Sequence, residues 1–386
     1  MIPEAAFCGR LPARGVVQVA GAKAERFLQG LVTADLPLVP RPPGAHYAAF
    51  LNGRGRVEFD AIVTRDPGTD SAFLLDVARS RAPALVQHLL RYRLRAAVEV
   101  RDVSDDWHVW ACCGVPAGKV GAAAVNLSDA RENAAAGIGA AGQDPRASDL
   151  GLRALVPALG RDAVAPAEHL VHRLRDVGVD VEVLDPDRMH ICYDAWRTAL
   201  GVPEGDDFAG NPLPLEMAVD SMHGIAFDKG CYLGQELTAR THYTGTIRKR
   251  ITPFIRGVGL DDNAQAGADR LCEMFRKYAA VQDMHGFARS IVRLGTREGA
   301  SNAIAHGEKL FLPDRSKPVG TVTSAVGNVG LAMLRLEEVF GSIQRGQSSA
   351  CSGIHNVGKP LNLADGSVAI PWKPVWWPDE TDRPPS

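Results

Sequence analysis

The feature that most limits the fold of this chain is its series of short apolar runs, some with the spacing of strands and some with the spacing of helices. Residues 47–51 are apolar, Asn52-Gly53 is a pair that favours a tight turn, and 57–63 is typical of a returning strand. Leucines then recur at helical spacing in 84–94. Strands and helices mixed in short runs indicate an α+β fold rather than a long series of βαβ units.

The other expected elements follow the same mixed pattern. The sequence predicts strands at 16–19, 73–77 and 107–113, helices at 22–36, 167–177 and 188–200, and surface loops around a few short strands over 118–149. In the helix at 188–200 we expect Ile191, Ala195 and Trp196 to form the buried side. A small C-terminal barrel is predicted by short strands at 247–258, 309–312, 319–324 and 330–336.

Residues 259–306 interrupt the barrel strands and differ from them in character. Their apolar side chains at helical spacing are Leu271, Met274, Phe275, Tyr278 and Val281. One amphipathic helix is therefore expected. Helical inserts between barrel strands are uncommon, and two explanations stay open: a real excrescence on the barrel or an error in the gene model. Because long surface insertions cost little loop entropy, we expect the rest of the chain to fold without 260–305.

Composition excludes several classes of protein and partner. The formal net charge of the 386 residues is −2, so the chain has no general attraction for nucleic acid or anionic membranes. No apolar run reaches the roughly 18 residues of a membrane span, so membrane insertion is not expected. Seven scattered cysteines without a CxxC pair argue against a disulfide framework or zinc site and favour a reducing compartment. Residues 1–14 contain no clear secretory or mitochondrial presequence.

The segment 214–250 carries the residues best suited to chemistry. Its centre is KGCYLGQE at 229–236, where Cys231 lies two residues after Lys229 and just before an expected helix at 235–240. A nearby ammonium group and a helix N-terminus both favour the thiolate form of a cysteine. These features predict a displayed, activated thiol.

The same segment has a simpler interpretation. Gly230 and Gly234 allow tight turns or close approach of a ligand, and Glu236 and Arg240 are spaced to pair along the helix. A lone cysteine such as Cys231 is often a small buried apolar residue, and glycine pairs are often plain turns. The pattern alone leaves both interpretations open.

KGCYLGQE followed by Ala239-Arg240 resembles the signature of the YgfZ-type folate-binding family, relatives of the glycine-cleavage T-protein, an aminomethyltransferase. Supporting segments occur in the expected order at 26–36, 46–63, 194–203, 214–250, 327–337 and 376–378. The continuation ARTHYTGTIRKR is most similar to the mitochondrial branch, iron–sulfur cluster assembly factors that act late, in [4Fe-4S] maturation, with A-type scaffold proteins. The resemblance covers about 15–258 and 307–378 and leaves out 259–306.

The resemblance implies a fold, a ligand and a compartment. The fold is T-protein-like, with two interlocked α+β subdomains around a central folate-binding hole plus a C-terminal β-barrel. The folate-binding region would span 1–248, with subdomains of about 15–45 plus 188–248 and of 46–187, and the barrel would span 249–386. Tetrahydrofolate would bind in the hole, and the mitochondrial matrix is the implied location.

Site residues carry over only at matching positions. A pterin needs a bidentate carboxylate in an apolar pocket. The resemblance implies Glu216 as the best candidate, because it lies in the PLEM segment that matches the ligand-facing loop of the family. The further folate-binding candidates are Tyr232, Gln235, Glu236, Arg240, Asn52 and Arg54. Asn52 and Arg54 lie at the hairpin tip and would rim the hole, with a type I′ turn and a solvated arginine as the equally weighted alternative. Cys231 is the implied working thiol, with Lys229 beside it.

One departure from the T-protein pattern concerns catalysis. That enzyme needs an acidic side chain in the helix after the strand that matches 73–77, and residues 77–98 contain no Asp or Glu. The region instead holds arginines, namely Arg79, Arg81, Arg91, Arg93 and Arg95, which form either a docking surface for an acidic partner or a solvated face. Aminomethyl transfer is therefore doubtful.

Three functional hypotheses follow. The leading one is an iron–sulfur cluster assembly factor, not itself an enzyme, in which Cys231 is a cluster ligand shared with an A-type scaffold, or a redox group. Iron–sulfur clusters normally take four ligands, so one thiol requires a partner that supplies the rest. The alternatives are a folate-dependent one-carbon transferase and a folate-binding module without thiol chemistry.

Overall fold

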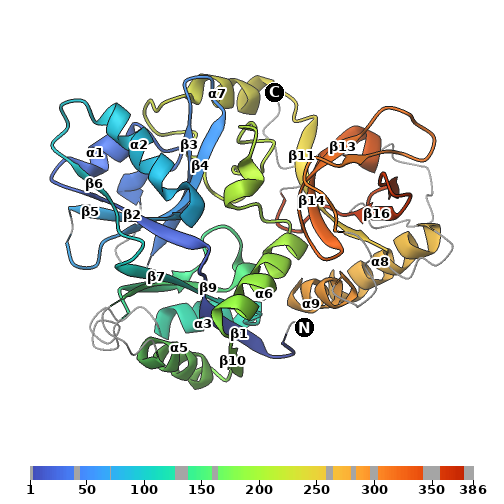
Figure 1. The fold of residues 1–386 in the computed structure, drawn as a ribbon, viewed down its shortest axis with the longest axis horizontal. Helices are drawn as coiled ribbons and strands as arrows, with labels where there is room; N and C mark the ends of the chain where they lie inside the picture. The colour runs from blue at the N-terminus through green and yellow to red at the C-terminus, as the bar shows by residue number, and fades with distance from the viewer. Residues whose placement is uncertain are drawn as a thin grey trace.

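Three β-sheets and the helices packed on them make up the described part of the chain (Figure 1). The computed structural model describes residues 3–38, 44–69, 71–126, 138–158, 164–257, 264–279, 284–295, 303–341 and 357–377. Within these ranges, none of the helices has both the length and the apolar character needed to cross a membrane.

The first sheet is antiparallel, with the strand order β3-β4-β5-β2-β6. Its strands are β2 (Arg14–Ala20), β3 (Ala45–Leu51), β4 (Val57–Arg65), β5 (Ala72–Ala78) and β6 (Glu99–Asp102). Its helical segments are α1 (Ala24–Gln29), η1 (Leu36–Leu38), η2 (Arg79–Arg81) and α2 (Ala82–Arg93). Since side chains alternate along a strand, Val17 and Val19 pack with α1 and α2, whereas Val16 faces a core shared with the second sheet.

The second sheet has the order β10-β1-β7-β9-β8, in which only the β1–β10 pair is parallel. Its strands are β1 (Ala6–Arg10), β7 (Trp107–Cys113), β8 (Ala140–Gln143), β9 (Leu152–Pro157) and β10 (Val181–Val183). The helical segments in this part are α3 (Ala117–Asn126), η3 (Ser148–Leu150) and α5 (Val164–Asp176). Cys112 packs on the α3–α5 side and Cys113 in the shared core, so the two thiols point to opposite faces of β7.

The third sheet forms the C-terminal barrel, with the order β12-β13-β14-β11-β16-β15. Its strands are β11 (Lys249–Arg256), β12 (Lys309–Leu310), β13 (Gly320–Val326), β14 (Val329–Arg335), β15 (Leu361–Asn362) and β16 (Val368–Pro371), with α10 (Leu336–Phe340) after β14. A bridge between Phe311 and Asn362 brings the two edges together. The expected α+β fold with a C-terminal barrel is confirmed.

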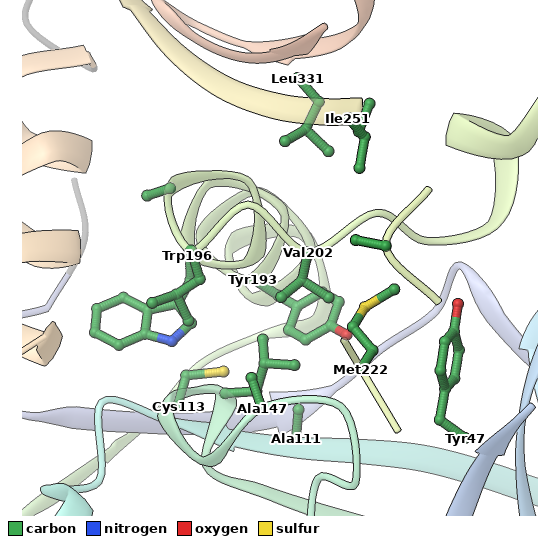
Figure 2. Packing of buried hydrophobic residues seen from close by; sticks show 14 of the residues in the cluster. Tyr47, Ala111, Cys113, Ala147, Tyr193, Trp196, Val202, Met222, Ile251 and Leu331 are labelled. Atoms are coloured by element: carbon green, nitrogen blue, oxygen red, sulfur yellow. The ribbon is translucent and has the colours of Figure 1, made fainter. Parts of the chain in front are cut away.

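Helix α6 (Pro186–Ala199) joins the three parts. Figure 2 shows Trp196 and Tyr193 projecting from α6 toward Ala111 and Cys113 of the second sheet, with barrel residue Ile251 on the other side of the helix. The chain then continues through η4 (Gly205–Phe208) and α7 (Gln235–Thr244) into the barrel. The shared core includes residues between Leu200 and Tyr232 and therefore fixes the segment 200–232 between the sheets and the barrel.

The insert after β11 is packed structure and not an excrescence. It forms two helices, α8 (Ala264–Ala279) and α9 (Met284–Gly295), instead of the single helix expected. Phe287 is 1% exposed, lies 5.9 Å from the Trp372 ring and belongs to the shared core. Arg293 pairs with Glu4 at 2.6 Å, so α9 also contacts the N-terminal segment. We therefore reverse the expectation that 260–305 can be removed without harm.

Four further expectations need correction. Ile191 is 58% exposed, because α6 buries the Met189, Cys192 and Trp196 side of the helix instead. The helix expected at 22–36 ends at Gln29, since Gly30 follows as its C-cap. The stretch 118–149 contains the short strand β8, as expected, but it begins with the helix α3, which was not expected. Hydrogen bonding also places 14–20 in one sheet with 45–102, and so the sheets divide the N-terminal region differently from the expected subdomains.

Candidate functional site

The loop that carries Cys231 is anchored by the ammonium group of Lys229. Lys229 Nζ donates hydrogen bonds to three main-chain carbonyl oxygens, those of Gln29 at 2.9 Å, Val32 at 2.9 Å and Ala34 at 2.6 Å. These carbonyls belong to the end of α1 and the turn after it, where helix carbonyls lack intrahelical partners. Burial lowers the pKa of Lys229 to about 8.

This geometry changes the role expected for Lys229. An ammonium group has three N–H donors, and each of them meets a carbonyl. Lys229 Nζ also lies 5.2 Å from the ring centroid of Tyr232, which is buried against the shared core. These contacts favour a role for Lys229 as an anchor of the loop over the expected role in activating the Cys231 thiol.

Two glycines dock the loop onto the β3–β4 hairpin. Gly234 has φ +77°, and a Cβ atom there would lie 2.3 Å from the carbonyl oxygen of Asn52. A Cβ atom on Gly55, whose φ is +73°, would lie 2.8 Å from the Gly234 carbonyl. The two backbones touch where only glycine fits. A Cβ on Gly230 would meet nothing within 4 Å, so the space beside Cys231 is open.

The hairpin tip owes its shape to Asn52. The Asn52 side-chain oxygen accepts hydrogen bonds from the backbone N–H groups of Arg54 at 2.9 Å and Arg56 at 3.2 Å. The loop between β3 and β4 spans 52–56, and its positive φ falls on Gly55. The expected two-residue Asn52-Gly53 turn is therefore wrong. Asn52 stabilises the turn and Arg54 is exposed to solvent.

Cys231 is exposed, as expected, and it is the one exposed free thiol among the residues that the structure describes. Cys8, Cys112, Cys113 and Cys192 are buried. A hydrogen bond with Cys8 and burial raise the pKa of Cys112, and burial raises the pKa of Cys113 and of Cys192. Cys272 is buried and disulfide-bonded. Burial therefore lowers the reactivity of the other described thiols, whereas Cys231 is accessible to solvent.

The helix after the loop uses its first residues for local structure. Gln235 accepts a hydrogen bond from the Tyr232 backbone N–H at 2.9 Å and so closes the turn before α7. Glu236 and Arg240 are both exposed and do not form the ion pair that their spacing predicted. Of the expected folate ligands in this segment, Tyr232 and Gln235 are thus committed to the loop itself.

Glu216 lies apart from the Cys231 loop, at the join with the barrel. Its carbonyl oxygen accepts a hydrogen bond of 2.7 Å from the N–H of Ile251 in β11. Its half-buried carboxylate accepts one long hydrogen bond, 3.4 Å from the Leu213 N–H. Most of the hydrogen-bonding capacity of this carboxylate is therefore available.

A cavity of about 530 Å³ opens where the three parts of the molecule meet. Its lining comes from several parts of the chain. Ala45 belongs to the first sheet, and Gln143 and Arg146 lie at the end of β8 and in the loop after it. Ser221 and His223 lie between η4 and α7, and Trp376 lies after β16. Trp376 is held by a hydrogen bond of 2.8 Å from its indole N–H to the Leu200 carbonyl. Ser221 Oγ has no hydrogen-bond partner within the described ranges. The volume falls within the roughly 300–1,000 Å³ of small-molecule sites.

Sequence reasoning missed this cavity. None of the residues expected to bind folate lines it. Ser221 and His223 lie in the segment 214–250 and Trp376 in the terminal WWP, so the resemblance included them without marking them as site residues. His223 has φ +58°, which is uncommon for a residue with a side chain and fixes the loop at the cavity wall.

Buried ion pairs support one wall of the cavity. Arg146 binds both carboxylate oxygens of Asp144, at 2.9 Å and 2.7 Å, and also contacts Glu204 and the Tyr193 hydroxyl. Burial alone would raise the pKa of Glu204, but the guanidinium groups of Arg14, Arg146 and other arginines outweigh it and hold the pKa well below 4.5. The charges of Arg146, Asp144 and Glu204 thus each meet an opposite charge.

Asp60 is the exception within this buried cluster. One of its carboxylate oxygens accepts a hydrogen bond of 3.0 Å from the Gly205 N–H, and the other has no partner within the described ranges. Burial raises the pKa of Asp60. The hydroxyl of Tyr47 is likewise buried without a partner. The sequence argued against aminomethyl transfer because residues 77–98 contain no acidic side chain. Asp60 lies outside that stretch and is a carboxyl group with an available oxygen.

Metal ligands do not cluster in the described part of the chain. No group of three or more His, Cys, Asp or Glu residues there is placed to hold a metal ion. Cys231 therefore has no protein ligands around it that would complete a metal site within the described ranges.

Comparison with known proteins gives family matches at both ends of the chain. Residues 13–139 match the model described as GCVT N-terminal domain, and residues 248–379 match the model described as CAF17, C-terminal beta-barrel domain. The second match spans the insert that holds α8 and α9.

Curated relatives align over almost the whole chain. The mitochondrial iron-sulfur cluster assembly factor IBA57 homolog of Mycosarcoma maydis is 32% identical over 398 residues, covering 97% of this chain and 86% of the relative. The mitochondrial iron-sulfur cluster assembly factor IBA57 of Homo sapiens is 33% identical over 382 residues, covering 96% of this chain and 85% of the relative.

A solved structure shares the fold. The glycine cleavage system aminomethyltransferase T from Bartonella henselae superimposes with a TM-score of 0.59 at 16% sequence identity, over 96% of this chain and 86% of that one. At this identity the similarity concerns the fold alone.

Proposed function

The chain belongs to the IBA57 family of mitochondrial iron–sulfur cluster assembly factors, and from this premise we propose that it assists [4Fe-4S] maturation in the mitochondrial matrix. Cys231 is its working thiol in this proposal. The observation that supports the proposal is the exposure of Cys231 next to open space, on a loop that the buried or half-buried residues Gly234 and Lys229 hold in place.

Cys231 contributes one ligand, and a partner contributes the others. A cluster normally takes four ligands, and the described residues provide no group that completes a site around Cys231. An A-type scaffold protein that carries the cluster as cargo is the partner we propose. Because Lys229 and Gly234 fix the loop before the partner arrives, little loop entropy is lost on binding.

The test mixes the purified protein with a cluster-loaded A-type scaffold and records the visible absorption spectrum. We expect a cluster species that forms with the natural chain and is lost with Cys231→Ser. Cys192→Ser, which alters a buried thiol on α6, is the matched control and keeps the species. An unchanged spectrum with Cys231→Ser would remove the thiol from the mechanism.

Tetrahydrofolate is the ligand we propose for the cavity at the junction. The cavity has a suitable volume and joins an aromatic wall at Trp376 to hydrogen-bonding groups at Ser221 and Gln143. The free hydroxyl of Ser221 is the observation that supports a polar ligand. Bound there, the ligand would hold the sheets and the barrel in one arrangement.

Thermal midpoints test the ligand and its place together. Tetrahydrofolate should raise the midpoint, because a ligand of the native state stabilises it by mass action. Ser221→Ala should reduce the shift if the ligand lies in the cavity, and Glu216→Ala should reduce it if the ligand lies at the barrel join. No shift at millimolar ligand would remove folate from the proposal.

We propose that the chain is not itself an enzyme. The T-protein likeness concerns the fold, and the relatives are named as assembly factors. The one-carbon transferase alternative can be tested at Asp60. Its raised pKa and its unpartnered oxygen suit a carboxyl group that accepts or donates a proton. Aminomethyl transfer that is lost in Asp60→Asn would establish the alternative.

A further inference from the structure

The surface around Cys231 is more basic than the chain as a whole. We define the Cys231 face as the exposed side chains of the hairpin tip 52–56, the loop 227–234 and the stretch 235–249. Its exposed charged residues are Arg54, Arg56, Arg240, Arg248, Lys249, Asp228 and Glu236. Five basic groups thus stand against two acidic ones, on a chain whose formal net charge is −2.

These segments form one continuous surface. At one end of the loop, Gly234 touches Gly55 of the hairpin tip. At the other end, the Phe227 ring stacks on the His242 ring near the C-terminus of α7, with 3.6 Å between the centroids. Cys231 lies between these two contacts, so basic side chains from the hairpin and from α7 flank it on either side.

The basic groups of the face are not neutralised by acidic side chains, although Arg56 donates a hydrogen bond of 3.1 Å to the Asn211 carbonyl. None of the five forms an ion pair with an acidic residue in the described part of the chain. Some exposed arginines elsewhere do so, as with Arg188 and Glu182 at 3.1 Å or Arg315 and Glu338 at 2.8 Å. The face therefore presents uncompensated positive charge to whatever approaches Cys231.

An aromatic side chain completes the face. Tyr243 is 59% exposed although its ring rests against His242, with centroids 4.9 Å apart, and near Phe227 at 6.4 Å. Tyrosine and arginine are the residues that dominate binding energy at protein interfaces, because they combine large contact area with polar groups. A supported but exposed tyrosine beside arginines is typical of an interface.

We infer that the Cys231 face is the docking surface for an acidic surface on the protein that brings the cluster, with Tyr243 as its central anchor. The inference rests on the proposed function and names the partner's chemistry. Thiolate ligands outnumber the positive charges of an iron–sulfur core, so the ligated cluster is itself an anion and suits the same basic surroundings. The basic side chains raise the association rate and orient the approach to Cys231.

The experiment measures association with an A-type scaffold, without its cluster and with it, at several salt concentrations. Arg240→Glu combined with Arg248→Glu should lower the association rate about tenfold at low salt and flatten its salt dependence. Tyr243→Ala should raise the dissociation rate. Arg91→Glu combined with Arg93→Glu tests the rival surface, the arginine-rich stretch 79–95. These exposed arginines precede β6, on the sheet edge opposite the hairpin, and should leave both rates unchanged. Rates that fall with this pair instead would place the docking surface there and overturn the inference.

The outcomes separate this inference from the proposed function. If the charge-reversed face binds the scaffold like the natural chain while Cys231→Ser still loses the cluster, the docking surface is wrong and the thiol mechanism stands. If the natural chain binds no scaffold and forms no cluster species, both fail. Binding of a short RNA that the same charge reversal abolishes, with scaffold binding unaffected, would also overturn the inference. Unchanged thermal midpoints of all variants ensure that the comparison concerns binding.

Discussion

The Cys231 loop and the α8–α9 insert use burial in opposite ways. The loop carries the most recognisable motif of the chain and exposes its reactive atom, with Lys229 and Gly234 as hidden anchors. The insert carries no motif, yet it places Phe287 in the shared core beside Trp372. A motif therefore marks where chemistry is displayed, and it says little about which segments hold the molecule together.

Removal of 264–295 should have the largest effect on stability. The deletion uncovers Trp196 and Trp372 of the shared core, which contact His285 and Phe287 of α9, so we expect loss of cooperative unfolding in urea. Phe287→Ala is the graded version and should lower the free energy of unfolding by about 3–5 kcal/mol.

The control for the insert is Glu273→Ala, on the exposed side of α8, which should change the free energy of unfolding by less than about 0.5 kcal/mol. Native-like unfolding of the deleted chain would show that α8 and α9 are accessory after all, and would restore the expectation drawn from loop entropy.

Lys229→Met should have the next largest effect and should act on the loop. It leaves the carbonyls of Gln29, Val32 and Ala34 without their donor, and hydrogen bonds to a charged group contribute about 1.5–3 kcal/mol each. We expect a loss of about 3 kcal/mol, seen as faster hydrogen exchange in 228–234. Lys249→Met, which removes an exposed lysine, should leave exchange unchanged. Equal exchange in both variants would mean that the three hydrogen bonds do not anchor the loop.

The fold was predictable where the sequence repeats a simple period. The hairpin strands, β2, β5 and β7 follow from short apolar runs, and α2 and α6 from leucines and other apolar residues at helical spacing. The buried side of α6 was assigned less well, because Ile191 satisfies the helical period equally on a face that the neighbouring sheets do not cover. Which face is covered depends on tertiary packing, and a single helix does not encode it.

The candidate site was predictable only in part, for a related reason. The motif located Cys231 and its exposure, but Lys229 had to be seen beside the end of α1, about two hundred residues away in sequence, before its role was clear. The cavity lining at Arg146, Ser221 and Trp376 comes together from three separate parts of the chain. Neither a spacing rule nor a local period connects such residues.

Gly234→Ala should destabilise the protein by about 1–2 kcal/mol. The new methyl group would stand 2.3 Å from the Asn52 carbonyl, and φ +77° is strained for alanine. Gly230→Ala is the matched control in the same loop, since its methyl group enters open space, and it should cost less than about 0.5 kcal/mol. Thermal midpoints of the pair decide the point, and equal midpoints would show that the loop does not press on the hairpin.

Cys231→Ser should have the smallest effect on stability and the largest on function. An exposed thiol has few packing contacts, so the free energy of unfolding should change by less than about 0.5 kcal/mol. On the native protein, limiting alkylation mapped by mass spectrometry should label Cys231 before Cys8, Cys112, Cys113 or Cys192, because reagents reach exposed thiols and burial raises the pKa of Cys113. A first label on one of the buried thiols would mean that the loop covers Cys231 in solution. The motif would then serve packing, and the contrast between the loop and the insert would disappear.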